Sequence, residues 1–143
     1  MKLQFITPDS PLYRDELELR FRVLRQPLGM ARDTVRFAFE GDSMHLVAVE
    51  RNRVLGCVLF HPDQAGGGRL FQMAVAAPLR GQGWGRRLVR ELERRLIAEG
   101  FARIELHARQ EAVGFYEGLG YRAVGAEFTE VGIPHRIMER QLD

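Results

Sequence analysis

The stretch Arg80-Gly81-Gln82-Gly83-Trp84-Gly85 joins two segments whose hydrophobic patterns differ. Before it, Arg69 to Ala76 is a mostly apolar run that predicts a strand, and Pro78 ends this run. After it, Arg86 to Glu99 repeats apolar residues at helical spacing and stops at Gly100, so we expect a long amphipathic helix. The apolar stripe of that helix consists of Leu88, Val89, Leu92, Leu96 and Ile97.

A glycine loop between a strand and a helix favours binding of an anion. The first N–H groups of a helix have no partner within the helix, and the helix dipole adds partial positive charge there. Alternate glycines let the backbone approach a pyrophosphate closely, and Arg80 can add a charge-assisted contact. The alternative is that Gly81, Gly83 and Gly85 only make a turn. The spacing fits neither the dinucleotide pattern G-x-G-x-x-G nor the P-loop pattern that ends in G-K-[ST].

The remaining segments predict an α/β (α+β) fold in one domain, residues 1–143, with a mixed sheet covered by helices. Helical spacing predicts a helix from Tyr13 to Arg25, and Asp33 to Asp42 is expected to be irregular. Asp63 to Gly68 is expected to be a flexible loop, and Glu111 to Leu119 a short helix. Further strands are expected at His45–Glu50, Val54–Phe60 and Ala102–Ala108, from Tyr121 to Gly125 at least, and at Arg136–Leu142.

Composition places the chain among ordinary globular proteins. It is 45% hydrophobic and 28% charged, and 143 residues can bury a core without a disulfide or a metal. The single cysteine, Cys57, lies in an apolar run and is expected to be part of the core. We see neither a signal peptide nor a segment long enough to span a membrane, so we expect no membrane partner and a cytoplasmic location.

The charge pattern argues against nucleic acid as a partner. The net charge is +2, and every basic residue except Lys2 is arginine. Nucleic-acid binding needs a dense basic stripe, whereas the arginines of the long helix alternate with Glu91, Glu93 and Glu99. A modest basic bias would still attract an anionic cofactor. No His, Cys, Asp or Glu cluster has metal-ligand spacing, so no metal is expected.

Two phrases of the sequence resemble the GNAT superfamily of N-acetyltransferases. The first is Met73 to Leu88, MAVAAPLRGQGWGRRL, which is similar to the family's V-x-P-x-x-R-G-x-G-x-G phrase. The second is Ala112 to Tyr121, AVGFYEGLGY, which is similar to the family's A-x-x-F-Y-x-x-x-G-[FY] phrase. They occur in the family's order and cover roughly Leu70 to Val124. The segment Phe128 to His135 also resembles an ElaA-like bacterial branch.

The resemblance implies acetyl-CoA as the acetyl donor and a mostly antiparallel sheet that splays open beside the cofactor strand. Backbone groups of Met73, Ala74 and Val75 would bind the pantetheine arm as an added strand. The loop from Arg80 to Arg86 (Arg80, Gly81, Gln82, Gly83, Trp84, Gly85 and Arg86) would hold the pyrophosphate. Gln110 stands where many relatives carry an asparagine that contacts the arm. Trp84 is expected to be a hydrophobic plug under the helix rather than a wall near the nucleotide.

The reaction needs a base for the ammonium, donors for the oxyanion and a proton for the thiolate. Tyr116 matches the family tyrosine that donates to the departing sulfur, whereas Phe115, which precedes it, is expected to pack beside the cofactor. His107 has a suitable intrinsic pKa for the base, although a histidine at a strand end can equally be a surface group. Many relatives carry a carboxylate on the strand before the loop, where this chain has Gln72.

Three other polar residues have two readings each. Glu105 shares a strand face with His107 and can simply be solvated. Glu130 and His135 can shape the acceptor pocket or be turn and edge residues.

The expected acceptor is a small-molecule amine or a protein amine, and a homodimer is the default assembly. The competing hypothesis is a module that senses acyl-CoA without turnover.

Overall fold

The computed structural model describes residues 1–143 and places seven strands in one sheet. In sheet order these are β1 (Lys2–Ile6), β2 (Met44–Glu50), β3 (Arg53–Pro62), β4 (Gly67–Val75), β5 (Arg103–Arg109), β7 (Ile133–Gln141) and β6 (Arg122–Glu130). Neighbouring strands are antiparallel except for the parallel pair β4 and β5. The predicted mixed, mostly antiparallel sheet is therefore confirmed, with the edge strand β1 as an element that the sequence did not indicate.

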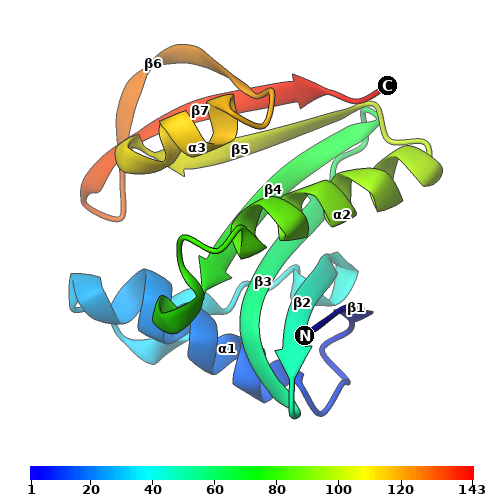
Figure 1. The fold of residues 1–143 in the computed structure, drawn as a ribbon. Coiled ribbons are helices and arrows are strands. Elements are labelled where there is room, and N and C mark those ends of the chain that lie inside the picture. The colour runs from blue at the N-terminus through cyan, green and yellow to red at the C-terminus, as the bar shows by residue number, and fades with distance from the viewer.

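The sheet opens between its two parallel strands. β4 and β5 pair only from Gly67 opposite Arg103 to Leu70 opposite Leu106, and beyond that point they diverge (Figure 1). A bulge in β4 lies just past the last pair, because Gln72 and Met73 together oppose one residue of β3. Gln72 has φ of +52°, which is unusual for a residue other than glycine. The predicted splay beside Met73 is thus confirmed.

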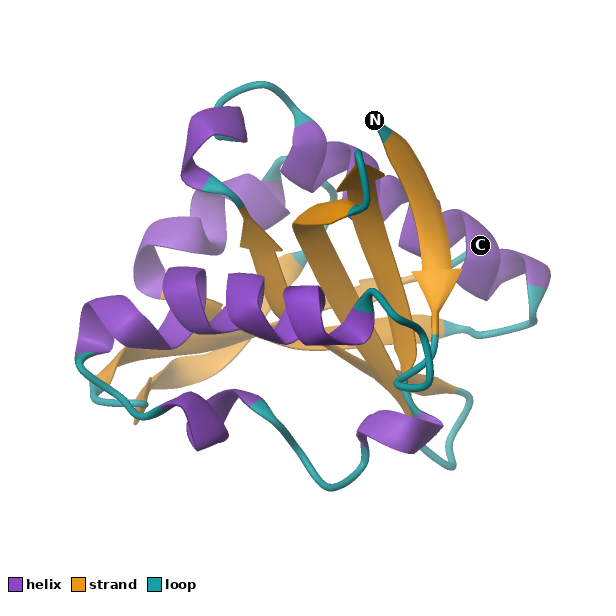
Figure 2. Cartoon of the chain, turned by 90° about the horizontal axis from the view of Figure 1, so that it is seen from below, coloured by secondary structure: helices purple, strands orange, loops and turns teal.

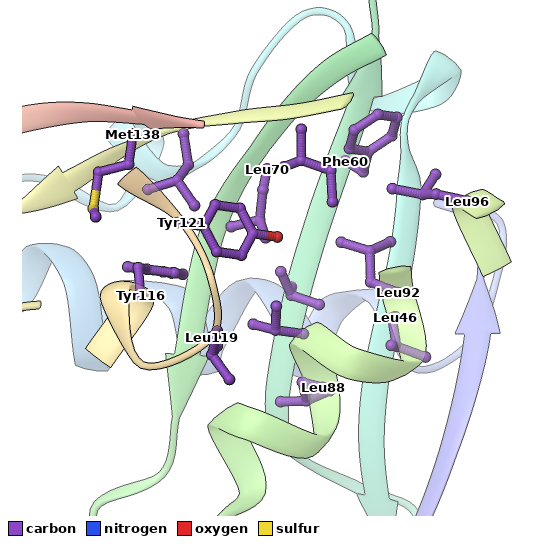
Figure 3. Packing of buried hydrophobic residues seen from close by; sticks show 14 of the residues in the cluster. Leu46, Phe60, Leu70, Leu88, Leu92, Leu96, Tyr116, Leu119, Tyr121 and Met138 are labelled. Atoms are coloured by element: carbon purple, nitrogen blue, oxygen red, sulfur yellow. The ribbon is translucent and has the colours of Figure 1, made fainter. Parts of the chain in front are cut away.

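Helices cover both faces of the sheet (Figure 2). Helix α2 (Trp84–Ala98) and the short α3 (Val113–Glu117) pack on one face, where the larger core cluster lies. In Figure 3, Leu88, Leu92 and Leu96 of α2 point into this core, which also contains Leu46, Phe60, Leu70, Tyr116 and Tyr121. Ile97, expected in the same stripe, is 42% exposed because it falls at the edge of the buried face. Helix α1 (Tyr13–Arg20) packs its Leu19 against the smaller cluster on the opposite face.

The segment after α1 stays helical but changes its winding. The predicted helix over Tyr13 to Arg25 is α-helical to Arg20 and continues as a π-helical turn, η1 (Phe21–Arg25). The predicted irregular region contains only short 3-10 turns, which include η3 (Arg32–Val35) and η4 (Glu40–Asp42). Three further 3-10 turns are η2 (Gln26–Leu28), η5 (Ala77–Leu79) and η6 (Gln110–Ala112). No helix of the fold is both long enough and apolar enough to cross a membrane.

Two predicted boundaries are wrong. The glycine run Asp63 to Gly68 is not a loop throughout, because β4 begins at Gly67, and a Cβ on Gly68 would lie 2.4 Å from the carbonyl oxygen of His61. Glycine there permits close strand pairing rather than flexibility. The further strand expected from Tyr121 runs as β6 to Glu130, and the last strand, predicted from Arg136, already begins at Ile133, so Glu130 and His135 lie at a β-hairpin between β6 and β7.

Candidate active site

A cavity of about 1000 Å³ lies at the splay and is lined from both faces of the sheet. Leu106 and Ala108 of β5 belong to the core under α2, so the alternate residues His107 and Arg109 point to the α1 side. The glycine loop and Tyr116 line the cavity from the α2 side. The cavity therefore connects a helix terminus on one face to a charged cluster on the other.

The helix-terminal end of the cavity is built from the glycine loop. Gly81, Gly83, Trp84, Gly85 and Arg86 all line it. Gly83 is the N-cap of α2 and has φ of +85°, which a side chain would disfavour. A Cβ on Gly85 would approach the Cε of Met73 to 3.0 Å, so glycine lets the helix start lie against β4. The first amides of α2 consequently point toward a cavity that can accept an anion.

Two polar side chains of the loop are hydrogen-bonded to backbone oxygens of the chain, although Arg80 also lines the cavity. The Nε of Arg80 donates to the carbonyl oxygen of Val75 at 3.2 Å, which ties the loop to the end of β4. The side chain of Gln82 donates to the carbonyl oxygen of Pro78 at 3.0 Å, and Gln82 is not among the lining residues. Gln82, expected to bind the cofactor, therefore lies outside the residues that line the cavity.

The open edge of β4 forms one wall. Met73, Ala74 and Val75 line the cavity, and no strand pairs with the β5 side of β4 beyond Leu70. An extended ligand could bind there through main-chain hydrogen bonds. Gln110, expected to contact the same ligand, is exposed in η6 and lies outside the lining, whereas its neighbours Glu111 and Ala112 line it.

The aromatic residues beside the loop depart from expectation. Phe115, expected to pack, is 39% exposed at the cavity, whereas Tyr116 is 5% exposed and belongs to the core. The short helix α3 turns Tyr116 inward and leaves Phe115 at the rim. Trp84 is not a plug under the helix, because it lies outside both core clusters and stacks on the guanidinium of Arg87, 4.1 Å from the ring centroid.

Tyr116 brings a phenol to the cavity wall. Its hydroxyl makes no hydrogen bond within the chain, unlike that of Tyr121 nearby, which donates to Glu93 at 2.8 Å. Burial raises the pKa of the Tyr116 phenol well above its usual value, so it stays protonated at neutral pH. A protonated phenol can donate a hydrogen bond to a ligand atom.

On the α1 side, His107 and Glu130 form a hydrogen-bonded pair. The Nδ1 of His107 lies 2.8 Å from Glu130 Oε1, and His135 Nε2 is 3.8 Å from the other carboxylate oxygen. Arg69 Nη2 lies 3.7 Å from Glu130, and Glu105 is 4.0 Å from His107 Nε2. All of these residues except Glu105 line the cavity. The β6–β7 hairpin brings Glu130 beside His107, a pairing that sequence spacing could not show.

The pair has the electrostatics of an oriented base. Burial opposes ionisation of Glu130, but the hydrogen bond from His107 and the nearby Arg69 and His135 lower the pKa of the carboxyl overall. The ionised carboxylate holds a proton on His107 Nδ1, which leaves the lone pair on Nε2. Such an arrangement can accept a proton from an ammonium group.

A buried polar network lies under α1, and the sequence did not reveal it. Arg20 donates to Glu16 Oε2 at 2.7 Å and to Glu40 Oε2 at 2.6 Å, while Tyr13 donates to Glu40 Oε1 at 2.5 Å. His45 Nδ1 lies 3.0 Å from Glu16 Oε2. Glu16, Glu40 and His45 are close enough to bind a metal ion, but the arginine already supplies the positive charge between the carboxylates. The only local signal was the i, i+4 spacing of Glu16 and Arg20, which is also common on exposed helix faces.

The network reaches the bulge of β4. Arg20 Nε donates to the side-chain oxygen of Gln72 at 3.2 Å, and Cys57 Sγ donates to the Gln72 carbonyl at 3.3 Å. Cys57 is fully buried, and burial raises the pKa of its thiol, which confirms its expected place in the core. Two buried side chains, Arg20 and Cys57, therefore hold the bulge that opens the sheet.

Comparison with known proteins agrees with this geometry. The family model described as an acetyltransferase (GNAT) domain matches residues 26–142. An acetyltransferase of Bacillus subtilis (strain 168) is 35% identical over 107 residues, which cover 72% of this chain and 69% of that protein. Escherichia coli ElaA superposes with a TM-score of 0.85 at 18% identity, covering 97% of this chain and 98% of ElaA. An aminoglycoside 6'-N-acetyltransferase complexed with coenzyme A has a TM-score of 0.78 at 21% identity over 100% of this chain and 98% of that one. At these identities, the two structures show the fold alone.

Proposed function

The chain belongs to the GNAT acetyltransferase family, and from this premise we propose that it transfers an acetyl group from acetyl-CoA to a primary amine by direct attack. The observation that carries the proposal is the cavity itself. It joins the start of α2 and the open edge of β4 to Tyr116 on one face and to the His107–Glu130 pair on the other. A fold relative solved with coenzyme A supports the choice of donor.

The donor fits the residues on the α2 side. Acetyl-CoA supplies an acetyl thioester, a pantetheine arm and a pyrophosphate. The free amides from Gly83 to Arg86 would hold the pyrophosphate, with Arg86 adding charge. The edge of β4 at Met73 to Val75 would bind the arm, and Phe115 would cover it at the rim.

The acceptor would enter from the α1 side. His107, oriented by Glu130, would take the proton from the ammonium so that a neutral amine attacks the thioester. Tyr116 would donate its proton or a hydrogen bond to the sulfur as it leaves. A backbone amide at the open edge of β4 would stabilise the oxyanion of the tetrahedral intermediate. Cys57 takes no part, because it is fully buried in the core.

Thermal unfolding with acetyl-CoA, adenosine diphosphate or NAD tests the donor site. A ligand at 100 times its dissociation constant stabilises a fold by about 2.7 kcal/mol, enough to raise the midpoint by several degrees. A shift with acetyl-CoA alone supports the proposal, and no shift at saturation contradicts it. Product formation with a panel of amines then separates an enzyme from an acyl-CoA sensor, which would bind without turnover.

We also propose that residues 1–143 form a single GNAT domain, that the protein is cytoplasmic and that it forms a homodimer. Light scattering at several protein concentrations tests the last of these, and a monomer at all concentrations would contradict it.

A further inference from the structure

Two arginines of the cavity wall converge on one carbonyl oxygen. Arg25 Nη1 donates to the Leu24 oxygen at 3.3 Å, and Arg109 Nη2 donates to the same oxygen at 2.9 Å. The two nitrogens can therefore be no farther apart than the sum of these distances, about 6 Å. Leu24 lies in the π-helical turn η1, whereas Arg109 ends β5, so the tertiary fold creates this juxtaposition.

Neither guanidinium has a counter-ion. Arg25 is only 8% exposed, and its other hydrogen bond goes to the backbone oxygen of Thr34. Neither Arg25 nor Arg109 forms an ion pair with a carboxylate of the chain. Burial and the charges of Arg109 and Arg20 lower the pKa of the Arg25 guanidinium, with only Glu130 acting against them. Capping one helical carbonyl does not require two full positive charges, so the cap alone leaves this arrangement unexplained.

The position of Arg25 and Arg109 indicates where in the cavity a bound anion would lie. Arg25 and Arg109 both line the cavity, and Arg109 lies on the same face of β5 as His107, two residues along the strand. Alternate residues of a strand are about 6.7 Å apart, so the two side chains start from neighbouring points of the wall. Arg86, which we propose to bind the donor pyrophosphate, lies instead at the start of α2.

We propose that Arg25 and Arg109 form a carboxylate subsite on the acceptor side, and that the acceptor is an amine whose carboxylate lies several bonds from its nitrogen. This inference rests on the proposed function, because it places the nitrogen at the His107–Glu130 pair. Two guanidinium groups can bind a carboxylate through charge-assisted hydrogen bonds, which a neutral amine cannot use. The pair is a specificity element and does not touch the reacting atoms.

The test compares ε-aminocaproate with its amide, two acceptors that share the same primary amine and chain length. We expect kcat/KM to be about tenfold or more higher for the carboxylate, the effect of one charged hydrogen bond. In Arg109→Gln this preference should fall to less than about threefold, because kcat/KM for the carboxylate falls by far more than kcat/KM for the amide. Arg25→Met is a second variant, and Arg122→Gln, which alters an exposed arginine paired with Glu139, is the matched control. Arg122→Gln should keep the full preference.

The outcomes separate this inference from the proposed function. Equal kcat/KM for both acceptors in the unaltered enzyme overturns the subsite and leaves the acetyltransferase intact. If Arg109→Gln raises KM for acetyl-CoA instead of weakening the carboxylate preference, the pair holds a phosphate of the donor and the subsite is wrong. Calorimetry of both compounds in the presence of coenzyme A needs no turnover. Arg109-dependent binding of the carboxylate alone, with no product formed, would support the subsite and contradict the proposed function.

Discussion

Replacing Tyr116 with phenylalanine separates catalysis from packing. The ring is 5% exposed and stays in the core, and the lost hydroxyl has no hydrogen-bond partner within the chain. The free energy of unfolding should therefore change by less than about 1 kcal/mol. If the phenol donates to the departing sulfur, kcat should fall by about 10²-fold or more, which corresponds to about 2.7 kcal/mol of transition-state stabilisation. The KM for acetyl-CoA should stay within about twofold.

Tyr121 is the matched control, because its ring lies 5.7 Å from that of Tyr116 in the same core (Figure 3). Its hydroxyl donates to Glu93, which also binds Arg90 and Arg140, so Tyr121→Phe removes one of several partners of a buried carboxylate. The expected cost is about 1–3 kcal/mol. For 143 residues the entropy of unfolding is about 300 cal/mol/K, so the midpoint should fall by about 3–10 °C.

The assay measures initial rates of acetylation and thermal midpoints for both variants. Tyr116→Phe should lose turnover and keep its midpoint, whereas Tyr121→Phe should lose its midpoint and keep turnover at a temperature where it is folded. If Tyr116→Phe turns over at the unaltered rate, the phenol has no part in the reaction. If Tyr116→Phe instead unfolds several degrees lower with unchanged kcat, the residue is a core residue only.

Three further perturbations address the loop, the buried network and its pH dependence. Gly83→Glu should abolish the midpoint shift with acetyl-CoA, because it adds negative charge at the start of α2 and a side chain at φ of +85°; a retained shift would remove the loop from the donor site. Arg20→Met should cost about 3–5 kcal/mol and lower the midpoint by about 10–17 °C, measured by calorimetry, because it leaves two buried carboxylates unpaired; a loss under about 1 kcal/mol would contradict this. Burial opposes protonation of His45, but Glu16 raises its pKa above 6.5 overall. Its contribution to the free energy of unfolding should be complete below that pH and fall as pH rises through the folded pKa, and a slope unchanged in His45→Gln would contradict this.

The sequence predicted the elements whose signals are local. The periodicity from Arg86 to Glu99, the glycine loop and the alternation in β5 each depend on neighbouring residues, and each of these elements is found in the structure. The strand β1 was missed because Lys2 to Ile6 is short and gains its stability from pairing with β2. The end of β6 could not be predicted, because its outer half is mostly exposed and carries little apolar signal.

The candidate site likewise contains residues that local motifs predict and residues that only the tertiary fold brings together. The residues near the start of α2 follow from local motifs, and the structure brings Gly83, Gly85 and Tyr116 to one cavity. The charged side of the cavity depends on strand order, because β7 lies between β5 and β6, and the β6–β7 hairpin carries Glu130 to His107. No spacing in the sequence encodes that meeting, which joins residues 23 positions apart through two registers.

The buried network under α1 gives a physical reason for the shape of the cavity. Gln72 holds a left-handed backbone that costs a residue other than glycine about 1–3 kcal/mol, and such conformations persist only where the surroundings impose them. Arg20 and Cys57 impose it by binding the side chain and the carbonyl of Gln72, respectively. Arg20 can do so only because Glu16 and Glu40 keep it charged and fixed within the core. The bulge at Gln72 turns β4 beyond its last pair with β5, and a β4 that continued its pairing would leave no gap between the two faces. A buried ion network that contacts no ligand therefore helps determine whether donor and acceptor can meet.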